Sequence, residues 1–155
     1  MESTITIRSF QVGDIDSVLA LEQECQELAH WSRRDYQDVL QGAMEGWVAA
    51  QDDAIGGFIV IRRIHHEVEI LSLAVARNER RKGIGSKLLQ TAMEHAIKGR
   101  ALRTYLEVRM TNDAALSLYR RHGFRVVGRR VGYYHSPNED ALTLATDLSA
   151  SNSWE

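Results

Sequence analysis

Polar and apolar residues alternate over positions 4–10, a pattern that predicts a β-strand ending at Gly13-Asp14. Apolar residues then recur at intervals of three and four, which predicts a helix from Asp14, as its cap, to about Ala29. Ser32 and Asp35 have the spacing of a capping box and open a second helix, which ends at Gly42. The first quarter of the chain is therefore expected to form a strand and two helices.

The central part of the chain alternates between the two-residue period of strands and the three-to-four-residue period of helices. Residues 47–50 and 55–61 flank the turn Asp52-Asp53 and predict a hairpin, whose paired glycines indicate a bulge or a close backbone approach. Residues 67–75 form a further apolar strand, and a helical pattern follows from Ile84 to Gly99. A short strand is expected at 104–108.

The last third predicts one helix and two strands. Asn112 and Gly123 are typical of the start and the end of a helix, and two extended runs, 125–132 and 141–146, follow it. The resulting order is β-α-α-β-β-β-α-β-α-β-β, an α/β fold with a mixed sheet of about seven strands and about four helices. We expect a single domain over 1–148 and a polar tail over 149–155.

Composition limits the class of protein. The 155 residues carry 19 basic and 21 acidic side chains, a net charge of −2, so general or sequence-specific nucleic-acid binding is not expected. Apolar runs stay short of the ~20 residues that a membrane span needs, and the N-terminus lacks a signal-peptide pattern, so a cytoplasmic protein is expected. The single Cys25 has helical spacing and is expected in the core.

The stretch from Arg77 to Lys87 carries the strongest chemical signal. It contains two glycines and three consecutive basic residues between an apolar strand and a helix. Glycines allow backbone N–H groups to converge on an anion, and a helix N-terminus adds partial positive charge. The stretch therefore predicts a site for a phosphorylated ligand.

Several further motifs make the chain similar to a known superfamily. Arg80-Arg81-Lys82-Gly83-Ile84-Gly85 matches the Arg/Gln-x-x-Gly-x-Gly/Ala signature, and Leu106-Glu107-Val108-Arg109, Asn112, Leu118-Tyr119, Gly123-Phe124 and Tyr133-Tyr134 continue the pattern. With these residues the chain resembles the GCN5-related N-acetyltransferases (GNAT), and within them the RimI-like ribosomal-protein-alanine N-acetyltransferases. The resemblance implies the GNAT fold and transfer of acetyl from acetyl-CoA to an amine.

The resemblance also assigns residues to the cosubstrate. The loop would hold the pyrophosphate, the preceding strand would face the pantetheine arm, and a backbone N–H near Val75 would polarise the thioester carbonyl. The residues expected to bind acetyl-CoA are Leu73, Ala74, Val75, Arg80, Arg81, Lys82, Gly83, Ile84, Gly85, Ser86 and Asn112.

Two residues are candidates for proton transfer. Strand alternation places Glu107 on the face opposite Leu106 and Val108. Spacing alone favours a carboxylate paired with the neighbouring Arg109, whereas the resemblance implies that Glu107 acts as the base. Tyr119 is the candidate acid for the departing thiolate, and its spacing also fits a core aromatic. Direct transfer in a ternary complex follows, without an acetyl-cysteine.

The acceptor is expected at a surface rich in aromatic residues. Trp31, Tyr36, Tyr133 and Tyr134 are candidates for its lining, and Glu139-Asp140 could attract a basic peptide or form a solvated loop. The resemblance implies the N-terminal alanine of a small-subunit ribosomal protein. The alternatives are a lysine side chain or a small-molecule amine as acceptor, and a coenzyme-binding module without turnover. No metal site is expected, because His65-His66 has no completing ligands.

Overall fold

The computed structural model describes residues 4–25 and 31–148. The elements in chain order are β1 (Thr6–Ser9), η1 (Val12–Asp14), α1 (Ile15–Glu24), α2 (Arg33–Asp38), η2 (Val39–Ala43), β2 (Glu45–Gln51), β3 (Ala54–Ile64), β4 (Glu67–Val75), η3 (Arg77–Glu79), α3 (Ile84–Lys98), β5 (Arg103–Arg109), α4 (Asp113–Arg121), β6 (Arg125–Tyr134) and β7 (Glu139–Asp147). This order confirms the predicted succession of helices and strands. The prediction that the first helix runs to about Ala29 is wrong, because α1 ends at Glu24 and Cys25 is already extended. The predicted tail 149–155 lies outside the described residues.

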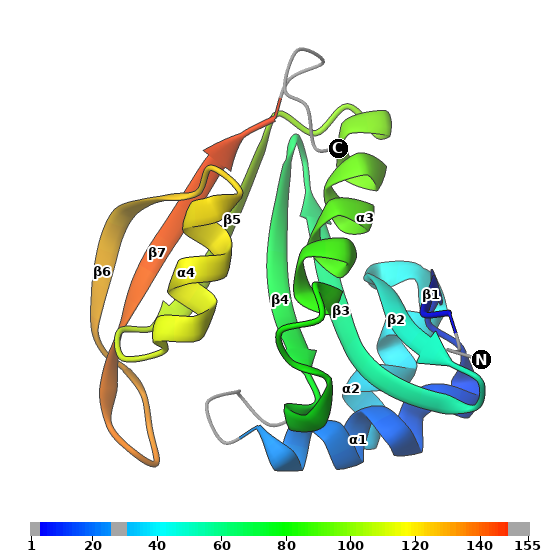
Figure 1. Ribbon diagram of the computed structural model, residues 1–155. Helices are drawn as coiled ribbons and strands as arrows, with labels where there is room; N and C mark the ends of the chain where they lie inside the picture. Colours follow the sequence, from blue (N-terminus) through cyan, green and yellow to red (C-terminus); the bar gives the residue numbers. More distant parts are fainter. Residues whose placement is uncertain (1–3, 26–30, 149–155) are drawn as a thin grey trace.

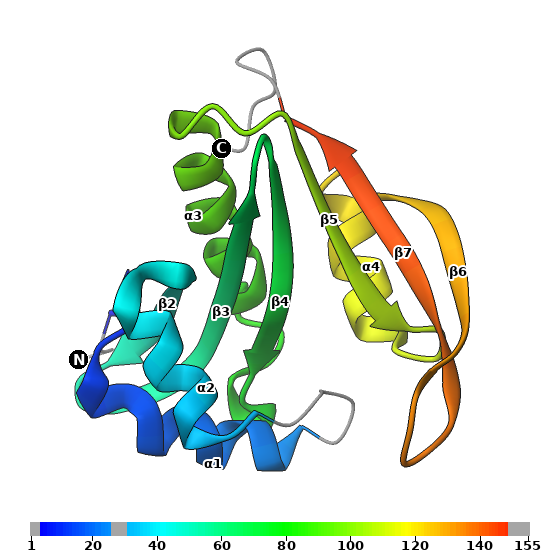
Figure 2. The same ribbon diagram turned by 180° about the vertical axis from the view of Figure 1, so that it is seen from behind.

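One seven-stranded sheet runs through the molecule in the order β1-β2-β3-β4-β5-β7-β6. β4 and β5 are parallel and all other neighbours are antiparallel, so the predicted mixed sheet is confirmed. Helices α3 and α4 cover one face of the sheet, and α1 and α2 cover the other (Figures 1 and 2).

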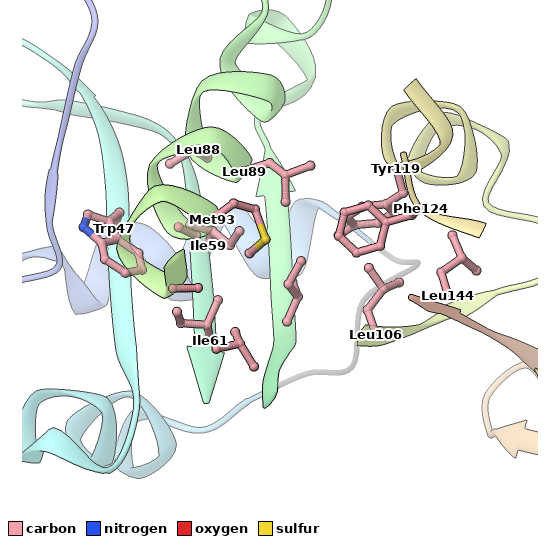
Figure 3. Close-up of a cluster of buried hydrophobic side chains, with 14 of the residues drawn as sticks. Trp47, Ile59, Ile61, Leu88, Leu89, Met93, Leu106, Tyr119, Phe124 and Leu144 are labelled. Atoms are coloured by element: carbon pink, nitrogen blue, oxygen red, sulfur yellow. The ribbon is translucent and has the colours of Figure 1, made fainter. Parts of the chain in front are cut away.

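Each face of the sheet has its own apolar core. Ile59, Leu88, Met93 and Leu106 belong to the core beneath α3 and α4 (Figure 3). The core beneath α1 and α2 contains several aromatic side chains, including Phe58. The two cores fix both pairs of helices relative to the single sheet.

Local sequence signals explain most element boundaries. Ser32 accepts a hydrogen bond from the backbone N–H of Asp35 and completes the predicted capping box. The expected bulge in the hairpin occurs at Gly56, where the pairing moves from Ala49–Gly57 to Ala50–Ile55. The predicted capping of α1 by the Asp14 side chain is wrong, because this carboxylate binds Arg8 and the backbone N–H of Gln11 instead.

A second bulge, in β4, shapes the centre of the sheet. Val60 pairs with Ser72 and Ile61 pairs with Ile70, so Leu71 is the extra residue. The bulge reverses the alternation of side chains: Ile70 belongs to the α3 side, whereas Ala74 belongs to the α1 side. Bulges bend the strand that carries them, and the pairing of β4 with β5 extends only from Glu67 to Glu69. Beyond it the two strands diverge (Figure 1).

No helix in the described part of the chain is long and apolar enough to cross a membrane.

Candidate active site

The end of β4 presents backbone donors to the region where β5 has diverged. The N–H of Ala76 donates to Gly56 O at 2.8 Å and therefore points toward β3. Successive N–H groups of a strand point to opposite edges, so those of Val75 and Leu73 point toward the β5 side. The β4–β5 ladder has ended at Glu69, so an extended ligand could pair with these groups. Leu73 and Val75 therefore have the orientation that the expected strand role requires, whereas the N–H of Ala74 points toward β3, as that of Ala76 does. Contact of these residues with the pantetheine arm stays a prediction.

The loop after β4 leads into the N-terminus of α3. Gly83, at the N-cap, has φ +78°, a left-handed conformation that favours glycine. Ile84 is buried and anchors the helix start in the core. The first N–H groups of an α-helix lack partners within the helix, and the helix dipole makes this end attractive to anions. The loop thus has the geometry expected of a phosphate site.

The three basic residues of this loop differ in their surroundings. Arg80 folds back, and its Nε donates to Val75 O at 3.2 Å. Lys82 forms an ion pair with Glu79 at 3.1 Å, and Arg81 is exposed with φ +69°. Arg80 is therefore engaged in holding the loop against the end of β4, a role that sequence spacing did not indicate.

The start of α3 is in contact with α4. A Cβ at Gly85 would lie 3.2 Å from Leu118 Cδ2, so the glycine allows the two helices to approach closely. Ser86 Oγ and His122 Nε2 are 3.0 Å apart. Burial, followed by the charge of Arg121, lowers the pKa of His122. Ser86 is thus positioned by a histidine that sequence reasoning did not assign.

Asn112 lies at the start of α4 and caps it. Its Oδ1 accepts a hydrogen bond from the backbone N–H of Ala115 at 3.2 Å. The cap fixes the side chain at the end of β5. Contact with the pantetheine arm stays a prediction.

Glu107 lies on β5 with only 9% of its side chain exposed. Thr143 Oγ1 donates to its Oε2 at 2.5 Å, and Arg130 Nε lies 3.4 Å from its Oε1. Thr143 is paired directly opposite Glu107 on β7. Arg109 forms its ion pair with Glu139 instead, so the structure does not support the alternative in which Glu107 pairs with Arg109.

Tyr119 is buried in the core between α4 and the sheet. Its ring makes an edge-to-face contact with Phe124 at 5.3 Å between centroids (Figure 3). Burial, followed by the proximity of Tyr134, raises the pKa of Tyr119. The hydroxyl therefore keeps its proton at neutral pH, and donation of this proton costs more free energy than it would for an ordinary tyrosine.

The expected acceptor residues separate into two groups. Tyr133 and Tyr134 lie at the end of β6 with ring centroids 5.0 Å apart, and Tyr133 is 46% exposed. Burial is the main cause that raises the pKa of Tyr134 to about 12. Trp31 is half-buried, and its ring contacts that of Tyr36 in a tilted arrangement with 5.2 Å between centroids.

The position of Tyr36 contradicts the prediction that it lines the acceptor surface. It is 0% exposed and packs between Phe10 and Phe58 in the core beneath α1 and α2. Burial, with the nearby Glu22 carboxylate, raises its pKa. The structure therefore places Tyr36 beneath Trp31 as a support, and not on a surface open to a peptide.

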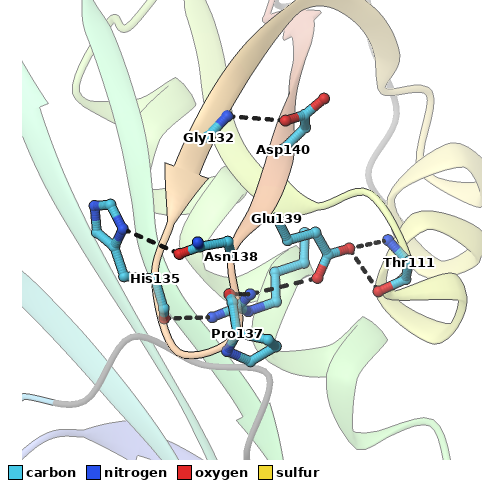
Figure 4. Close-up of polar contacts among 8 residues, drawn as sticks. Thr111, Gly132, His135, Pro137, Asn138, Glu139 and Asp140 are labelled. Atoms are coloured by element: carbon cyan, nitrogen blue, oxygen red, sulfur yellow. Dashed lines mark hydrogen bonds and ion pairs between the residues drawn. The ribbon is translucent and has the colours of Figure 1, made fainter.

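Glu139 and Asp140 are not free surface charges. Glu139 is bound by Thr111 and Arg109, and Asp140 by Arg129. Figure 4 shows the contacts of Thr111 with Glu139 and of the Gly132 N–H with Asp140. The hydrogen bond from the Thr111 hydroxyl is the main cause that lowers the pKa of the Glu139 carboxyl. The hydrogen bond from the Gly132 amide is the main cause that lowers the pKa of the Asp140 carboxyl. The pair therefore organises the β6–β7 turn.

Comparison with known proteins adds the family. The model of the Acetyltransferase (GNAT) family matches residues 14–124. An N-alpha-acetyltransferase of Sulfolobus acidocaldarius is 30% identical over 158 residues, covering 92% of each chain. The chain belongs to the GNAT acetyltransferase family. The resemblance inferred from the glycine loop and the later motifs is thereby confirmed.

Ribosomal-protein acetyltransferases are among the similar proteins. The [ribosomal protein bS18]-alanine N-acetyltransferase of Escherichia coli is 26% identical over 146 residues, covering 93% of this chain and 98% of its own. The crystal structure of the Escherichia coli ribosomal-protein-S18-alanine N-acetyltransferase superposes with a TM-score of 0.86 at 25% identity, covering 96% and 97% of the chains. Ard1 from Thermoplasma volcanium also gives 0.86, at 28% identity and 94% and 98% coverage. Within the GNAT family, the chain is thus similar to ribosomal-protein-alanine N-acetyltransferases.

Within the described residues, no group of three or more His, Cys, Asp or Glu side chains is arranged to hold a metal ion.

Proposed function

We propose that the protein transfers acetyl from acetyl-CoA to the N-terminal α-amine of a protein, with the alanine of a small-subunit ribosomal protein as the leading acceptor. The observation that carries the proposal is the pair of outward-facing N–H groups at Val75 and Leu73, next to the glycine loop that opens α3. The names of the relatives in Sulfolobus acidocaldarius and Escherichia coli support an α-amine. A ribosomal acceptor would place the reaction in the cytoplasm.

Acetyl-CoA supplies the activated acetyl group as a thioester. The residues Arg81–Ser86 would hold its pyrophosphate, and Leu73–Val75 with Asn112 would flank the pantetheine arm. The Val75 N–H would stabilise the carbonyl oxygen as it gains negative charge, an interaction worth roughly 3 kcal/mol in other enzymes.

Glu107 and Tyr119 would move the protons in a direct transfer. Glu107 removes a proton from the attacking amine, directly or through a water molecule, as the new C–N bond forms. Tyr119 donates its phenolic proton to the sulfur as the C–S bond breaks. The products are the free thiol, the acetylated amine, a protonated Glu107 and a Tyr119 phenolate. Glu107 then releases its proton to solvent and Tyr119 takes one up, which restores both side chains and balances the reaction.

The free energy needed to deprotonate the acceptor favours an α-amine. An α-amine with a pKa of about 8 must lose a proton at pH 7 at a cost of about 1.4 kcal/mol, whereas a lysine with a pKa of about 10.4 requires about 4.6 kcal/mol. Arg130 and the Thr143 hydroxyl hold the Glu107 carboxylate in place. Carboxylates are in general weak bases, which suits the acceptor that is easier to deprotonate.

Peptide turnover tests the proposal. The protein is incubated with acetyl-CoA and peptides that begin with Ala, Ser or Met, and with an acetyl-Ala peptide that contains an internal Lys. Release of free thiol with the Ala peptide is expected, together with mass spectrometry that places the acetyl group on the α-amine. Release only with the blocked Lys peptide would move the activity to side chains. Binding of acetyl-CoA without release for any amine would favour a module without turnover.

A further inference from the structure

Arg109, the last residue of β5, is a buried cation bound to the turn between β6 and β7. Only 8% of its side chain is exposed. Its Nη1 donates to Pro137 O at 3.0 Å and lies 3.3 Å from Glu139 Oε1, and its Nη2 donates to His135 O at 3.4 Å. One guanidinium thus holds two turn carbonyls and one carboxylate; His135, Pro137 and Glu139, which supply them, are labelled in Figure 4.

The same guanidinium contacts the aromatic pair. Its central carbon lies 4.4 Å from the ring centroid of Tyr134, and Tyr134 contacts the more exposed Tyr133 edge to face. A cation over an aromatic ring is attractive, and more so when water is excluded. Arg109 therefore sets the position of the Tyr134 ring as well as that of the turn.

A second contact fastens the turn to the chain after β5. Glu139 Oε2 accepts hydrogen bonds from Thr111 N at 2.7 Å and from Thr111 Oγ1 at 2.5 Å. Glu139 is thus held by Thr111 on one oxygen and by Arg109 on the other. The segment after Glu107 and the turn after Tyr134 are joined through this carboxylate.

The β-ladder between β6 and β7 is interrupted before the end of β6. Arg130 pairs with Ala141, but the next pair is Tyr134 with Glu139, so β6 contains two extra residues there. Extra residues interrupt ladder hydrogen bonds. The position of Tyr133 and Tyr134 therefore depends on side-chain contacts more than on strand pairing.

From these contacts we infer that Arg109 is a positioning residue for the acceptor: it holds the Tyr133–Tyr134 end of β6 in register with Glu107, two residues earlier on the same face of β5. The inference rests on the proposed function, in which this end of β6 faces the acceptor. It assigns Arg109 no contact with acetyl-CoA, so its effect is confined to the acceptor side.

Steady-state kinetics of Arg109→Lys tests this role. Lysine keeps the charge but lacks the planar fork that reaches two carbonyls and a carboxylate together. We expect KM for the Ala-starting peptide to rise about tenfold or more, while KM for acetyl-CoA stays within about twofold. Arg125→Gln is the matched control, because Arg125 lies exposed at the other end of β6 beside Asp147, and should change neither KM. An unchanged peptide KM, or an equal rise in both, would overturn the inference.

Hydrogen exchange gives a readout independent of turnover. In Arg109→Lys, and more weakly in Glu139→Gln, amides of residues 132–139 should exchange faster while those of α3 keep their wild-type rates. Unchanged exchange over 132–139 in both variants would contradict the positioning role. If Arg109→Lys does not fold, Glu139→Gln alone decides between these outcomes. If the wild-type protein does not acetylate the peptide, the proposed function fails while the exchange measurement still tests Arg109.

Discussion

At the scale of single residues, the proposed proton transfers depend on surroundings that lie far apart in the sequence. Tyr119 shares the core with Phe124, and burial raises its pKa. Glu107 is bound by Thr143 and Arg130 from β7 and β6. The roles of acid and base could be predicted from family motifs, but the partners could not, because the pairing of Glu107 with Thr143 exists only after β5 and β7 align.

Replacing the Tyr119 hydroxyl should slow the chemical step. In Tyr119→Phe we expect kcat to fall about 100-fold or more with little change in acetyl-CoA affinity, because the thiolate loses its proton donor while the ring still packs. Thiol release and calorimetric binding measure the two effects. Tyr105→Phe, which removes a hydroxyl earlier on β5, is the control. Unchanged turnover in Tyr119→Phe would remove this residue from the mechanism.

Replacing the Glu107 carboxylate should give a defect that depends on pH. In Glu107→Gln we expect kcat/KM to fall about 100-fold near pH 7. The defect should shrink toward pH 9, because an α-amine with a pKa of about 8 then loses its proton unaided. Rates from pH 6.5 to 9 for both proteins provide the comparison. A constant ratio across this range would contradict the role of base.

At the scale of elements, two close approaches determine where the ligand-facing backbone lies. Gly57 on β3 allows β4 and α3 to pack closely, and Gly85 does the same for α3 and α4. The sequence indicated a bulge or a close approach at the paired glycines, and both occur, at Gly56 and Gly57. The bulge at Leu71 was not predicted, since no glycine marks it and an apolar strand has the same composition with or without an extra residue.

A side chain at Gly57 should destabilise the fold. Its Cβ would lie 2.9 Å from Ala74 O and 3.1 Å from side-chain atoms of Ile84 and Leu88. We expect Gly57→Ala to lower the free energy of unfolding by about 1–3 kcal/mol, as overpacking does. Urea unfolding measures the change. Gly13→Ala is the control, because nothing lies within 4 Å of its Cβ; equal stability of both variants would show that the sheet relaxes freely.

The burial of His122 should make stability depend on pH. The pKa of His122 is lowered by burial and then by Arg121, so the folded protein accepts this proton at lower pH than the unfolded chain does. The stabilising contribution is complete above about pH 6.5, the ordinary histidine pKa, and is lost as pH falls through the lower folded-state value.

His122→Gln should therefore lose less unfolding free energy between pH 7 and 5.5 than the wild-type protein. Urea unfolding at several pH values measures this slope. His66→Gln, at an exposed histidine, should keep the wild-type slope. Parallel curves for wild-type and His122→Gln proteins would contradict the assignment.

At the scale of the whole molecule, three paired positions between β4 and β5 join two parts of the sheet. Different helices cover the two parts (Figure 1). The β5-β7-β6 part holds Glu107, Tyr134 and Arg109, and the other part holds the glycine loop and the end of β4 (Figure 2). A ligand that touches both parts would add contacts that the short ladder does not provide.

Coenzyme A should therefore stabilise the protein by mass action. At a concentration 100 times its Kd, the gain is about 2.7 kcal/mol, which corresponds to a rise in Tm of about 5–10 °C for a chain of this size. Differential scanning calorimetry measures it. Pantetheine, which lacks the pyrophosphate, should give a much smaller rise at equal concentration. Equal rises would show that the glycine loop does not recognise the phosphates.

The sequence by itself determined the order of elements, the glycine loop, the helix caps at Ser32 and Asn112, and the family, because each depends on residues close together in the chain. Only the tertiary structure decided the burial of Tyr36, the turn of Arg80 toward Val75, and the partners of Glu107 and Arg109. These depend on a strand bulge and on pairing between distant strands. Packing of this kind sets which side chains face one another, and local pattern does not record it.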